Sequence, residues 1–399
     1  MFEREIDRIG SGSAKWDAAP VIFGEKDILP MWVADMDFQV ATPISQAIAR
    51  QAEHGIFGYP AESDTLRQAV VDRIHAKFDW PIQKEWLVFS SGIVHALHMI
   101  IKAFTAPGDG VVIQPPVYYP FFSAITNNGC TVLENQLIEN KGVYSMDFPG
   151  LETSFQPDWG GFGPQPSRAR LLLLCSPHNP VGRVWSKEEL NQAARIALAH
   201  DALIISDEIH AELLYSGHSH LPTSMLGEDV ARRTITCFSP SKTFNLAGLN
   251  ASVLIIPDPK IRAVFKQRTA GFHATPGVIG LAAMEAAFRH GDPWLQELLP
   301  YLEGNLNYLM EFFKTRLPQL PVTSPEGTYL VWFNCRKLGL SDSELRNFMR
   351  KKAKVGLDDG YMFGSGGSGY QRINIACPRS RLEQGLTRIA KAVHDHMAG

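Results

Sequence analysis

Short apolar runs alternate with amphipathic segments through the middle of the chain. Between residues 85 and 290 the apolar runs occupy 111–114, 171–175, 202–206, 234–238 and 251–256. Each run is apolar on both faces, which is typical of strands in a parallel sheet covered by helices on both sides. The segments between them, notably 93–104, 187–200 and 276–290, have helical patterns. This alternation predicts an α/β fold with a mainly parallel sheet.

The two ends of the chain have a different pattern. Residues 1–50 predict an extended arm with a helix that begins at Pro43 and ends near Glu53, and the glycine- and proline-rich stretch 145–168 predicts a surface excursion. After residue 290 a long helical pattern precedes T-Y-L-V-W-F-N-C, another helix, Y-Q-R-I-N-I-A and a final helix. We therefore expect an arm that forms part of a small domain (1–50), a large domain (51–288) and a small α+β domain (289–399).

Composition narrows the classes of function. Apolar residues make up 45% of the 399 residues, charged residues make up 20%, and the net charge is −3, which argues against a nucleic-acid or anionic-membrane partner. No uninterrupted apolar stretch approaches 18 residues, and the N-terminus M-F-E-R-E-I-D-R lacks the apolar region of a secretory signal. The five cysteines are scattered without a C-x-x-C pair. This usage predicts no metal site and a location in the reducing cytoplasm.

Two polar segments that follow apolar runs carry the candidate chemistry. S-D-E-I-H at 206–210 contains Asp207, and S-P-S-K-T-F-N-L-A-G at 239–248 contains Lys242. A lysine amine can form a Schiff base with the aldehyde of pyridoxal phosphate (PLP), and a carboxylate can hold the pyridine nitrogen protonated. Each residue alone also has an ordinary structural explanation: Lys242 as a solvated surface lysine and Asp207 as an acid in a turn. Together they predict a PLP enzyme.

Six segments carry a family resemblance. They are M-W-V-A-D-M-D-F, H-G-I-F-G-Y, C-S-P-H-N-P-V-G-R-V-W, S-D-E-I-H, S-P-S-K-T-F-N-L-A-G-L and R-I-N-I-A-C-P-R, in that order. The chain resembles the fold-type I PLP enzymes and, within them, the PatB/MalY-type cystathionine β-lyases, from about residue 5 to 395. The resemblance implies a large PLP-binding domain, whose mainly parallel seven-stranded mixed sheet is sandwiched by helices, and a small domain from both chain ends.

The activity that the resemblance implies is β-elimination from a small sulfur-containing amino acid, such as cystathionine or cysteine, to give a thiol, pyruvate and ammonia. Two alternatives stay open. The first is a PLP-dependent aminotransferase, and the second is a PLP-binding regulatory protein with little catalysis.

The resemblance implies roles at the reacting end of the cofactor. Lys242 would be the Schiff-base lysine and the base that removes the Cα proton, and Asp207 would pair with the pyridinium nitrogen. Asn179 would donate to the phenolate oxygen and lie near the substrate carboxylate, although an N-P turn also explains it. His210 occupies a position where related aminotransferases often have a tyrosine, so it either contacts the cofactor or is structural. We assign no chemistry to His178.

The phosphate group of the cofactor requires backbone N–H groups at a helix start together with hydroxyl groups. S-S-G-I-V-H-A-L at 90–97 predicts such a turn. The residues expected to bind the phosphate are Gly92, Ile93 and Val94 through the backbone, and Ser239 and Ser241 through their hydroxyls. Many relatives have an arginine eight residues after the lysine, whereas this chain has Asn250. Either dipoles and hydroxyls alone meet the phosphate charge, or a different cation does.

Aromatic residues and one arginine complete the expected site. Tyr118 would stack on the pyridine ring, and Tyr119 would either assist proton transfer near the substrate or anchor its loop. Arg372 would bind the substrate α-carboxylate with its planar fork, unless it is only a strand residue. Tyr59 resembles a tyrosine that reaches the phosphate of the neighbouring subunit, which implies a homodimer with shared active sites.

One motif suggests a different function, the binding of a dinucleotide. G-S-G-G-S-G at 364–369 matches the G-x-G-x-x-G pattern of dinucleotide-binding loops. It follows no clear strand and runs into Y-Q-R-I-N-I-A instead of opening a helix, so its context is wrong for that function. We interpret it as a flexible loop near the mouth of the active site.

Overall fold

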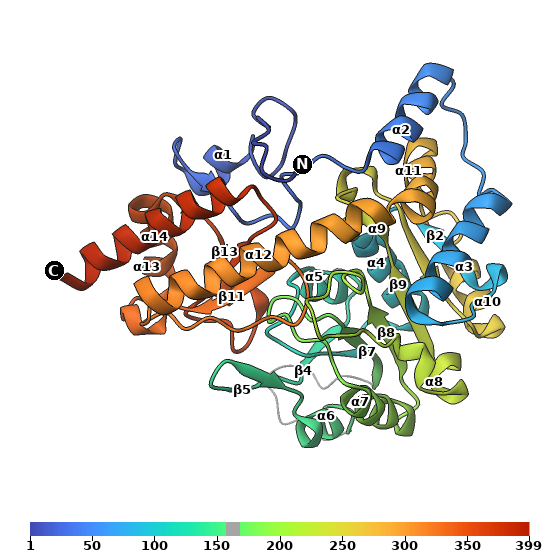
Figure 1. Cartoon of the computed structure of the whole chain (residues 1–399). Coiled ribbons are helices and arrows are strands. Elements are labelled where there is room, and N and C mark those ends of the chain that lie inside the picture. Colours follow the sequence, from blue (N-terminus) through green and yellow to red (C-terminus); the bar gives the residue numbers. More distant parts are fainter. Residues whose placement is uncertain (157–167, 399) are drawn as a thin grey trace.

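A seven-stranded sheet forms the centre of the protein, in a computed structural model that describes residues 1–156 and 168–398 (Figure 1). The strand order is β2–β10–β9–β8–β7–β3–β4. Their bounds are β2 (Leu87–Ser90), β10 (Ser252–Ile255), β9 (Thr234–Phe238), β8 (Leu203–Asp207), β7 (Ala169–Cys175), β3 (Gly110–Ile113) and β4 (Thr131–Glu134). β10 is antiparallel to both of its neighbours and the other pairs are parallel. The predicted α/β fold with a mainly parallel mixed sheet is confirmed.

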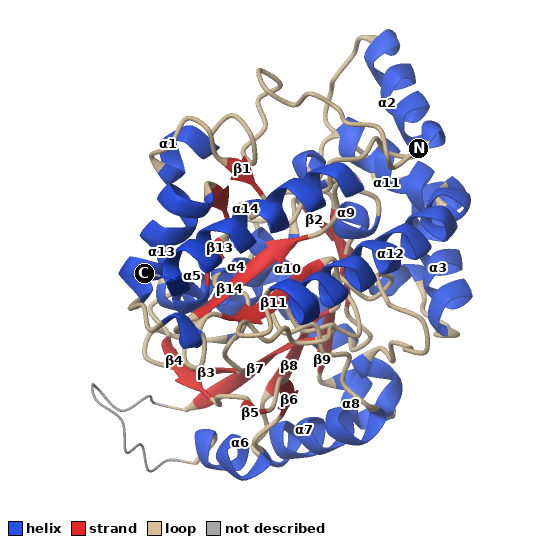
Figure 2. Ribbon diagram, turned by 60° about the vertical axis from the view of Figure 1, so that its left-hand side comes forward, coloured by secondary structure: helices blue, strands red, loops and turns tan. Residues whose placement is uncertain are grey.

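Helices cover both faces of this sheet, because successive residues of each strand pack on opposite sides. In β3, Val111 and Ile113 join a buried cluster with α4 (Ile93–Phe104), α5 (Pro120–Thr126) and α10 (Pro259–Arg268). Val112 joins a second cluster with α6 (Phe148–Ser154) and α7 (Lys187–Ala199). Figure 2 shows the strands as a layer between helices.

The predicted elements of this region agree with the structure to within about two residues. All five apolar runs form strands, and the three helical patterns form α4, α7 and α11 (Val278–His290). Ser186 and Glu189 begin α7 with a reciprocal capping box. The excursion at 145–168 contains α6, and its residues 157–167 lie outside the described part of the chain.

A second, smaller sheet lies beyond the long helix α12 (Asp292–Arg316). Its strand order is β11 (Leu330–Asn334), β14 (Tyr370–Asn374) and β13 (Asp358–Asp359), and α14 (Arg379–Ala398) follows it. The arm contributes β1 (Leu29–Pro30), which pairs in parallel with β12 (Val355–Gly356). Both chain ends therefore meet in one unit (Figure 1). The residue boundaries between domains stay a prediction.

The remaining elements are short or peripheral. The helices are α1 (Ala19–Phe23), α2 (Thr42–His54), α3 (Asp64–Phe78), α8 (Glu228–Arg232), α9 (Pro240–Thr243) and α13 (Asp342–Asn347), and β5 (Ile138–Asn140) pairs with β6 (Val143–Ser145). Short 3₁₀ turns lie at Lys84–Trp86, Thr223–Leu226, Ala247–Leu249, Arg336–Leu338 and Gly360–Phe363, and a π-helical turn lies at Phe348–Ala353. None of the described helices combines the length and the apolar character that crossing a bilayer requires.

The glycine-rich segment 364–369 follows a 3₁₀ turn and leads into β14, so no helix opens there, as its context predicts. The segment is closely packed. A Cβ atom on Gly367 would collide with the carbonyl oxygen of Gly360, and one on Gly364 would collide with the ring of Phe122. These glycines therefore permit close backbone approach instead of binding a dinucleotide.

Candidate active site

The carboxyl ends of neighbouring strands and the first turn of α4 surround a cavity of about 200 Å³. Ligand sites of α/β sheets lie at this edge because the loops that follow parallel strands converge there. The cavity is lined by nine of the predicted site residues, namely Gly92, Ile93, Val94, Tyr118, Asn179, Asp207, His210, Ser241 and Lys242. It is also lined by Ala34, Ser91, His95, Cys175, Ile209, Ala247, Asn250 and Ala251.

Lys242 lies on α9, directly after β9. Its Nζ atom donates a hydrogen bond of 2.7 Å to the carbonyl oxygen of Ala34. Burial, followed by the nearby guanidinium of Arg372, lowers the pKa of Lys242 to about 8. A larger fraction of this amine is unprotonated near neutral pH than for an ordinary lysine, as a nucleophile or base requires.

Asp207 and Glu208 point to different environments although they are adjacent. The carboxylate of Asp207 lines the cavity and accepts a 3.3 Å hydrogen bond from the backbone N–H of Ile209, and burial raises its pKa to about 7. Glu208 points into the protein, where it accepts from Ser206 at 2.7 Å and pairs with His220 at 2.8 Å. Asp207 therefore faces the cavity while Glu208 holds the turn.

His210 lines the cavity with an unsatisfied nitrogen. Its Nδ1 atom is buried and has no hydrogen-bond partner among the described residues. Burial and the nearby cations Lys242 and Arg372 lower the pKa of His210 to about 3, so the ring is neutral at physiological pH. A buried polar atom of this kind normally has a partner. A polar group of a bound ligand would supply one.

The first turn of α4 closes one end of the cavity. Gly92 is the N-cap residue, with φ of 90° and ψ of 154°, a conformation that favours glycine. The backbone N–H groups at a helix start attract anions, and Ser241 also lines this cavity. Ser239 is expected from the sequence to bind the phosphate, but it is not among the residues that line the cavity. Its hydroxyl donates to the carbonyl of Ala251 at 2.8 Å and caps α9 through the N–H of Ser241.

Arg372 is almost completely buried and reaches the cavity through Asn179. Its Nη1 atom donates to Oδ1 of Asn179 at 2.9 Å, and its Nη2 atom donates to the carbonyl of Trp32 and forms an ion pair with Asp358. Its guanidinium lies 5.0 Å above the ring of Phe363. The Nε atom has no partner among the described residues. The arginine is held rigidly and can still donate to a carboxylate.

The two tyrosines of the P-P-V-Y-Y-P segment have different positions. Tyr118 lines the cavity. Tyr119 is not among the residues that line it, and the centroid of its ring lies 5.5 Å from that of Tyr118 and 5.6 Å from that of Phe363. Burial raises the pKa of both hydroxyls, so both stay protonated at neutral pH. His178 is fully buried and bonds the carbonyl of Pro116 at 3.0 Å, a structural role.

Tyr59 lies outside this cavity. It is fully exposed in the loop between α2 and α3. Tyr59 therefore does not contribute to the cavity of its own chain.

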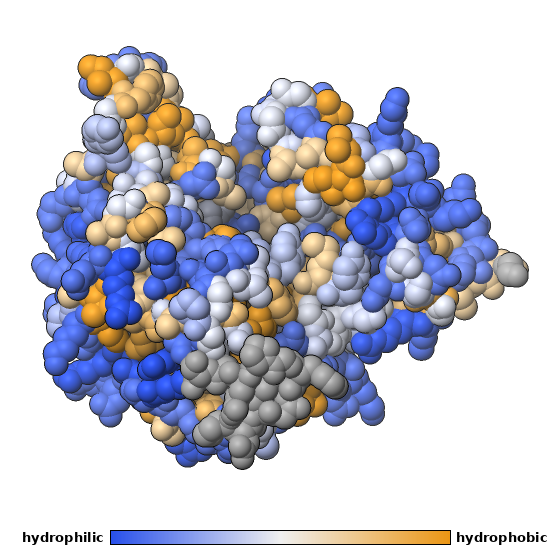
Figure 3. All heavy atoms as spheres, turned by 180° about the vertical axis from the view of Figure 1, so that it is seen from behind, coloured by the Kyte–Doolittle hydropathy of each residue, from blue (hydrophilic) through white to orange (hydrophobic). Residues whose placement is uncertain are grey.

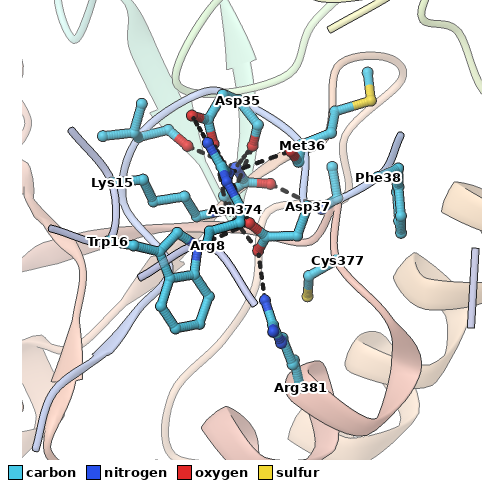
Figure 4. A network of polar contacts seen from close by, with 12 residues as sticks. Arg8, Lys15, Trp16, Asp35, Met36, Asp37, Phe38, Asn374, Cys377 and Arg381 are labelled. Atoms are coloured by element: carbon cyan, nitrogen blue, oxygen red, sulfur yellow. Dashed lines mark hydrogen bonds and ion pairs between the residues drawn. The ribbon is translucent and has the colours of Figure 1, made fainter. Parts of the chain in front are cut away.

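A network of buried charges holds the segment 33–38, which carries Ala34, against the site (Figure 4). Asp37 accepts hydrogen bonds from Arg8 at 2.8 Å, Trp16 at 2.9 Å and Lys15 at 2.9 Å. From the smaller sheet, Asn374 donates to the carbonyls of residues 33 and 35 at 2.6 Å. The arm and the C-terminal unit thus jointly fix the carbonyl that binds Lys242.

Sequence reasoning missed three groups at the site. They are the carbonyl of Ala34, the carboxylate of Asp358 beside Arg372, and the ring of His95. Ala34 acts through its backbone, and Asp358 is one of two adjacent acids with no local signal. His95 is part of the predicted anion-binding turn, and its place in the first helical turn was the available signal.

The site fits PLP in four respects. It has a buried amine for the aldehyde, a buried carboxylate for the ring nitrogen, an unsatisfied histidine nitrogen, and a helix N-terminus for the phosphate. These groups converge on a single cavity from stretches far apart in the sequence.

Comparison with known proteins over nearly the whole chain also supports a PLP-dependent enzyme. A model of the aminotransferase class I and II family matches residues 26–389. The chain is 43% identical over 397 residues to cystathionine beta-lyase PatB of Bacillus subtilis, covering 98% of this chain and 99% of that protein. It is 32% identical over 397 residues to protein MalY of Escherichia coli, covering 98% of each. The crystal structure of cystalysin from Treponema denticola, which contains PLP, superposes with a TM-score of 0.94 at 35% identity, covering 99% of both chains.

Proposed function

The chain belongs to the aminotransferase class I and II family, and we propose that it is a PLP-dependent carbon–sulfur lyase that acts by β-elimination on sulfur-containing amino acids. The observation that carries the proposal is the convergence of Lys242 and Asp207 on one buried cavity, in a chain that matches a cystathionine beta-lyase over 98% of its length. When bound, PLP supplies the electron sink that stabilises negative charge at the substrate Cα.

Lys242 would hold the cofactor aldehyde, and after the substrate amine has displaced it, its free amine would remove the Cα proton. Its lowered pKa makes the free amine available for both tasks. The carboxylate of Asp207 holds the proton on the ring nitrogen, and the added positive charge keeps this buried carboxylate ionised. His210 and Asn179 bind the polar substituent of the ring. Tyr118 covers one face of the ring.

Arg372 and Asn179 bind the substrate α-carboxylate. Their mutual hydrogen bond of 2.9 Å sets the two groups side by side, and Asp358 holds the guanidinium from behind. Tyr119 stays protonated and lies beside this pair, where it can supply a proton to the leaving group. With the proton taken from Cα by Lys242 and the thiolate expelled from Cβ, the remaining three-carbon fragment would be hydrolysed by one water molecule, so that the products are the thiol, pyruvate and ammonia.

The decisive assay uses the purified protein with cystathionine. We expect pyruvate, ammonia and free thiol at a steady rate without any 2-oxo acid, since elimination returns the cofactor in its aldehyde form. Turnover that requires a 2-oxo acid and yields its amino counterpart would assign the protein as an aminotransferase instead. Binding of PLP without turnover of either kind would favour a regulatory role.

The exposed loop after α2 supports a homodimer with shared sites. Ile56, Phe57 and Tyr59 are all exposed there, and Figure 3 shows apolar atoms on the projecting lobe that carries α2. Exposed apolar residues grouped in this way mark interaction surfaces. In the homodimer, Tyr59 reaches the phosphate of the neighbouring subunit. A cytoplasmic location is part of the proposal, because all five cysteines are buried free thiols.

A further inference from the structure

The phosphate end of the cavity is poor in positive charge. Among the described residues that line the cavity, Lys242 is the single lysine or arginine, and its Nζ atom is bound to the carbonyl of Ala34. A phosphate monoester carries between about −1.5 and −2 charges at neutral pH. The N-terminus of a helix offers only about half a positive charge. Additional donors beside the start of α4 are therefore required.

His95 lines the cavity in the first turn of α4 and has a fixed tautomer. Its Nε2 atom accepts a hydrogen bond of 3.0 Å from the backbone N–H of Ala274. A ring nitrogen that accepts carries no proton, so in the neutral ring the proton is on Nδ1. Nδ1 makes no hydrogen bond with the described residues and is not sealed from solvent. The ring thus has a free N–H donor at the cavity.

The segment that holds His95 is itself tied to the phosphate end. Ser91 donates its backbone N–H to the carbonyl of Ala274 at 2.9 Å, and His273 bonds the carbonyl of Phe89 at 2.7 Å. The rings of His95 and His273 stack with centroids 5.7 Å apart. Burial, His273 and His98 lower the pKa of His95, which keeps its ring neutral.

We propose that His95 is a phosphate-binding residue of the cofactor site, which donates its Nδ1–H to a phosphate oxygen beside the backbone N–H groups of α4. This inference rests on the proposed function, which places the phosphate there. Asn250, which also lines the cavity, brings no positive charge to this end of it. A Cβ atom on Gly92 would lie 3.7 Å from its side-chain Oδ1, so the amide of Asn250 faces the same helix start.

The test compares two ligands that differ only in the phosphate. Dissociation constants of PLP and of pyridoxal are measured by absorption for the cofactor-free full chain, for His95→Phe and for the control His98→Phe. His98 lies on the same helix, one turn on, and does not line the cavity. We expect His95→Phe to weaken PLP binding by about tenfold or more, because it removes a hydrogen bond to a charged group. Pyridoxal binding should be unchanged, and His98→Phe should alter neither constant.

Equal weakening of PLP and pyridoxal by His95→Phe would show a structural role for His95 and overturn the inference, as would unchanged binding of PLP. A wild-type protein that binds neither ligand would contradict the proposed function and the inference with it. Circular dichroism and the melting temperature establish that each variant is folded. If the phenylalanine ring prevents folding, His95→Leu is measured against the same two ligands and judged by the same outcomes.

Discussion

The amine of Lys242 donates a 2.7 Å hydrogen bond to the carbonyl oxygen of Ala34, a residue 208 positions earlier in the chain. The same carbonyl accepts from the hydroxyl of Tyr329 at 2.9 Å. A backbone oxygen held in this way gives the amine a fixed partner whenever it is not bonded to the cofactor. The position of the Lys242 amine therefore depends on the segment 33–38 as well as on α9.

Replacement of the proposed base should abolish catalysis. We expect Lys242→Ala to lower kcat by about a thousandfold or more, because general base catalysis is lost along with the covalent link. The variant should still bind PLP without the visible absorption band of the wild type. Lys260→Ala, at an exposed lysine of α10, is the control. Undiminished turnover by Lys242→Ala would refute the assignment.

The proposed binding of the substrate α-carboxylate by Arg372 can be tested with a substitution that keeps the positive charge. Arg372→Lys should lower kcat/KM by about 10- to 100-fold, mainly through KM, because an ammonium cannot form the planar pair of hydrogen bonds. Arg336→Lys is a matched control, since Arg336 also lies over an aromatic ring, that of Tyr370 at 4.8 Å, but is exposed. Similar losses in both variants would remove the support for Arg372 as a substrate ligand.

Asp207 should make the cofactor-free protein less stable as the pH rises. Its pKa is about 7 in the folded protein against 3.8 ordinarily, so between these values the folded state keeps a proton that the unfolded state has lost. The stability of the wild type falls with rising pH in that window, and Asp207→Asn lacks this dependence.

From pH 4 to pH 7 the free energy of unfolding of Asp207→Asn should therefore rise relative to that of the wild type, by up to about 4 kcal/mol. Urea unfolding at several pH values measures this difference. A difference that is constant with pH would show that Asp207 is already ionised in the folded protein. Bound PLP should reduce the dependence, because the protonated ring compensates the charge.

Shared sites can be tested by mixing two inactive proteins. Lys242→Ala and Tyr59→Phe subunits each lack one group, but a heterodimer contains one site with both groups intact. Complete statistical exchange should restore about a quarter of the wild-type activity, since about half of the dimers are mixed. Labelled subunits establish that exchange has occurred. Exchange without recovered activity would contradict the role of Tyr59.

The buried network of the arm should contribute strongly to stability. Lys15→Met leaves Asp37 with Arg8, Trp16 and the more distant Arg381, and we expect a loss of about 3 kcal/mol in the free energy of unfolding. Lys26→Met, on the surface, should change it by less than about 0.5 kcal/mol.

The pKa of Asp37 is lowered, because the attraction of Lys15 and the hydrogen bonds outweigh burial. The advantage of the wild type over Lys15→Met should therefore be present above the ordinary carboxyl pKa and decrease as the pH falls through the lowered one. An advantage that does not change on acidification would mean that the Lys15 contribution is not electrostatic.

Local patterns predict most of the strands but not their directions. The apolar runs at 171–175 and 251–256 look alike, yet β7 is parallel to its neighbours and β10 is antiparallel. Burial on both faces produces the same run in either direction. The sequence analysis does not identify β2, which directly follows the 3₁₀ turn at Lys84–Trp86, or β4, which has one fully buried residue and includes exposed Glu134.

Motifs predict the residues at the site but not the contacts that hold them. Nine of the expected residues line one cavity. Ser239 was assigned to the phosphate because it is a hydroxyl near Lys242, but capping of α9 uses that hydroxyl instead. The partners Ala34 and Asp358 depend on long-range packing, which has no signature in the local sequence.

Because the chain is synthesised from its N-terminus, hydrogen bonds between residues far apart in the sequence can form only late. Arg372 bonds Asn179 across 193 positions, and Asn374 bonds the carbonyl of Val33 across 341. On a ribosome the arm emerges first, and the carbonyls of residues 33 and 35 must wait for β14 before Asn374 can bond them. Contacts of such sequence separation form slowly and late in folding. A nascent chain that has completed its central sheet therefore still lacks the contacts that hold Arg372, Asn179 and the segment 33–38 in place.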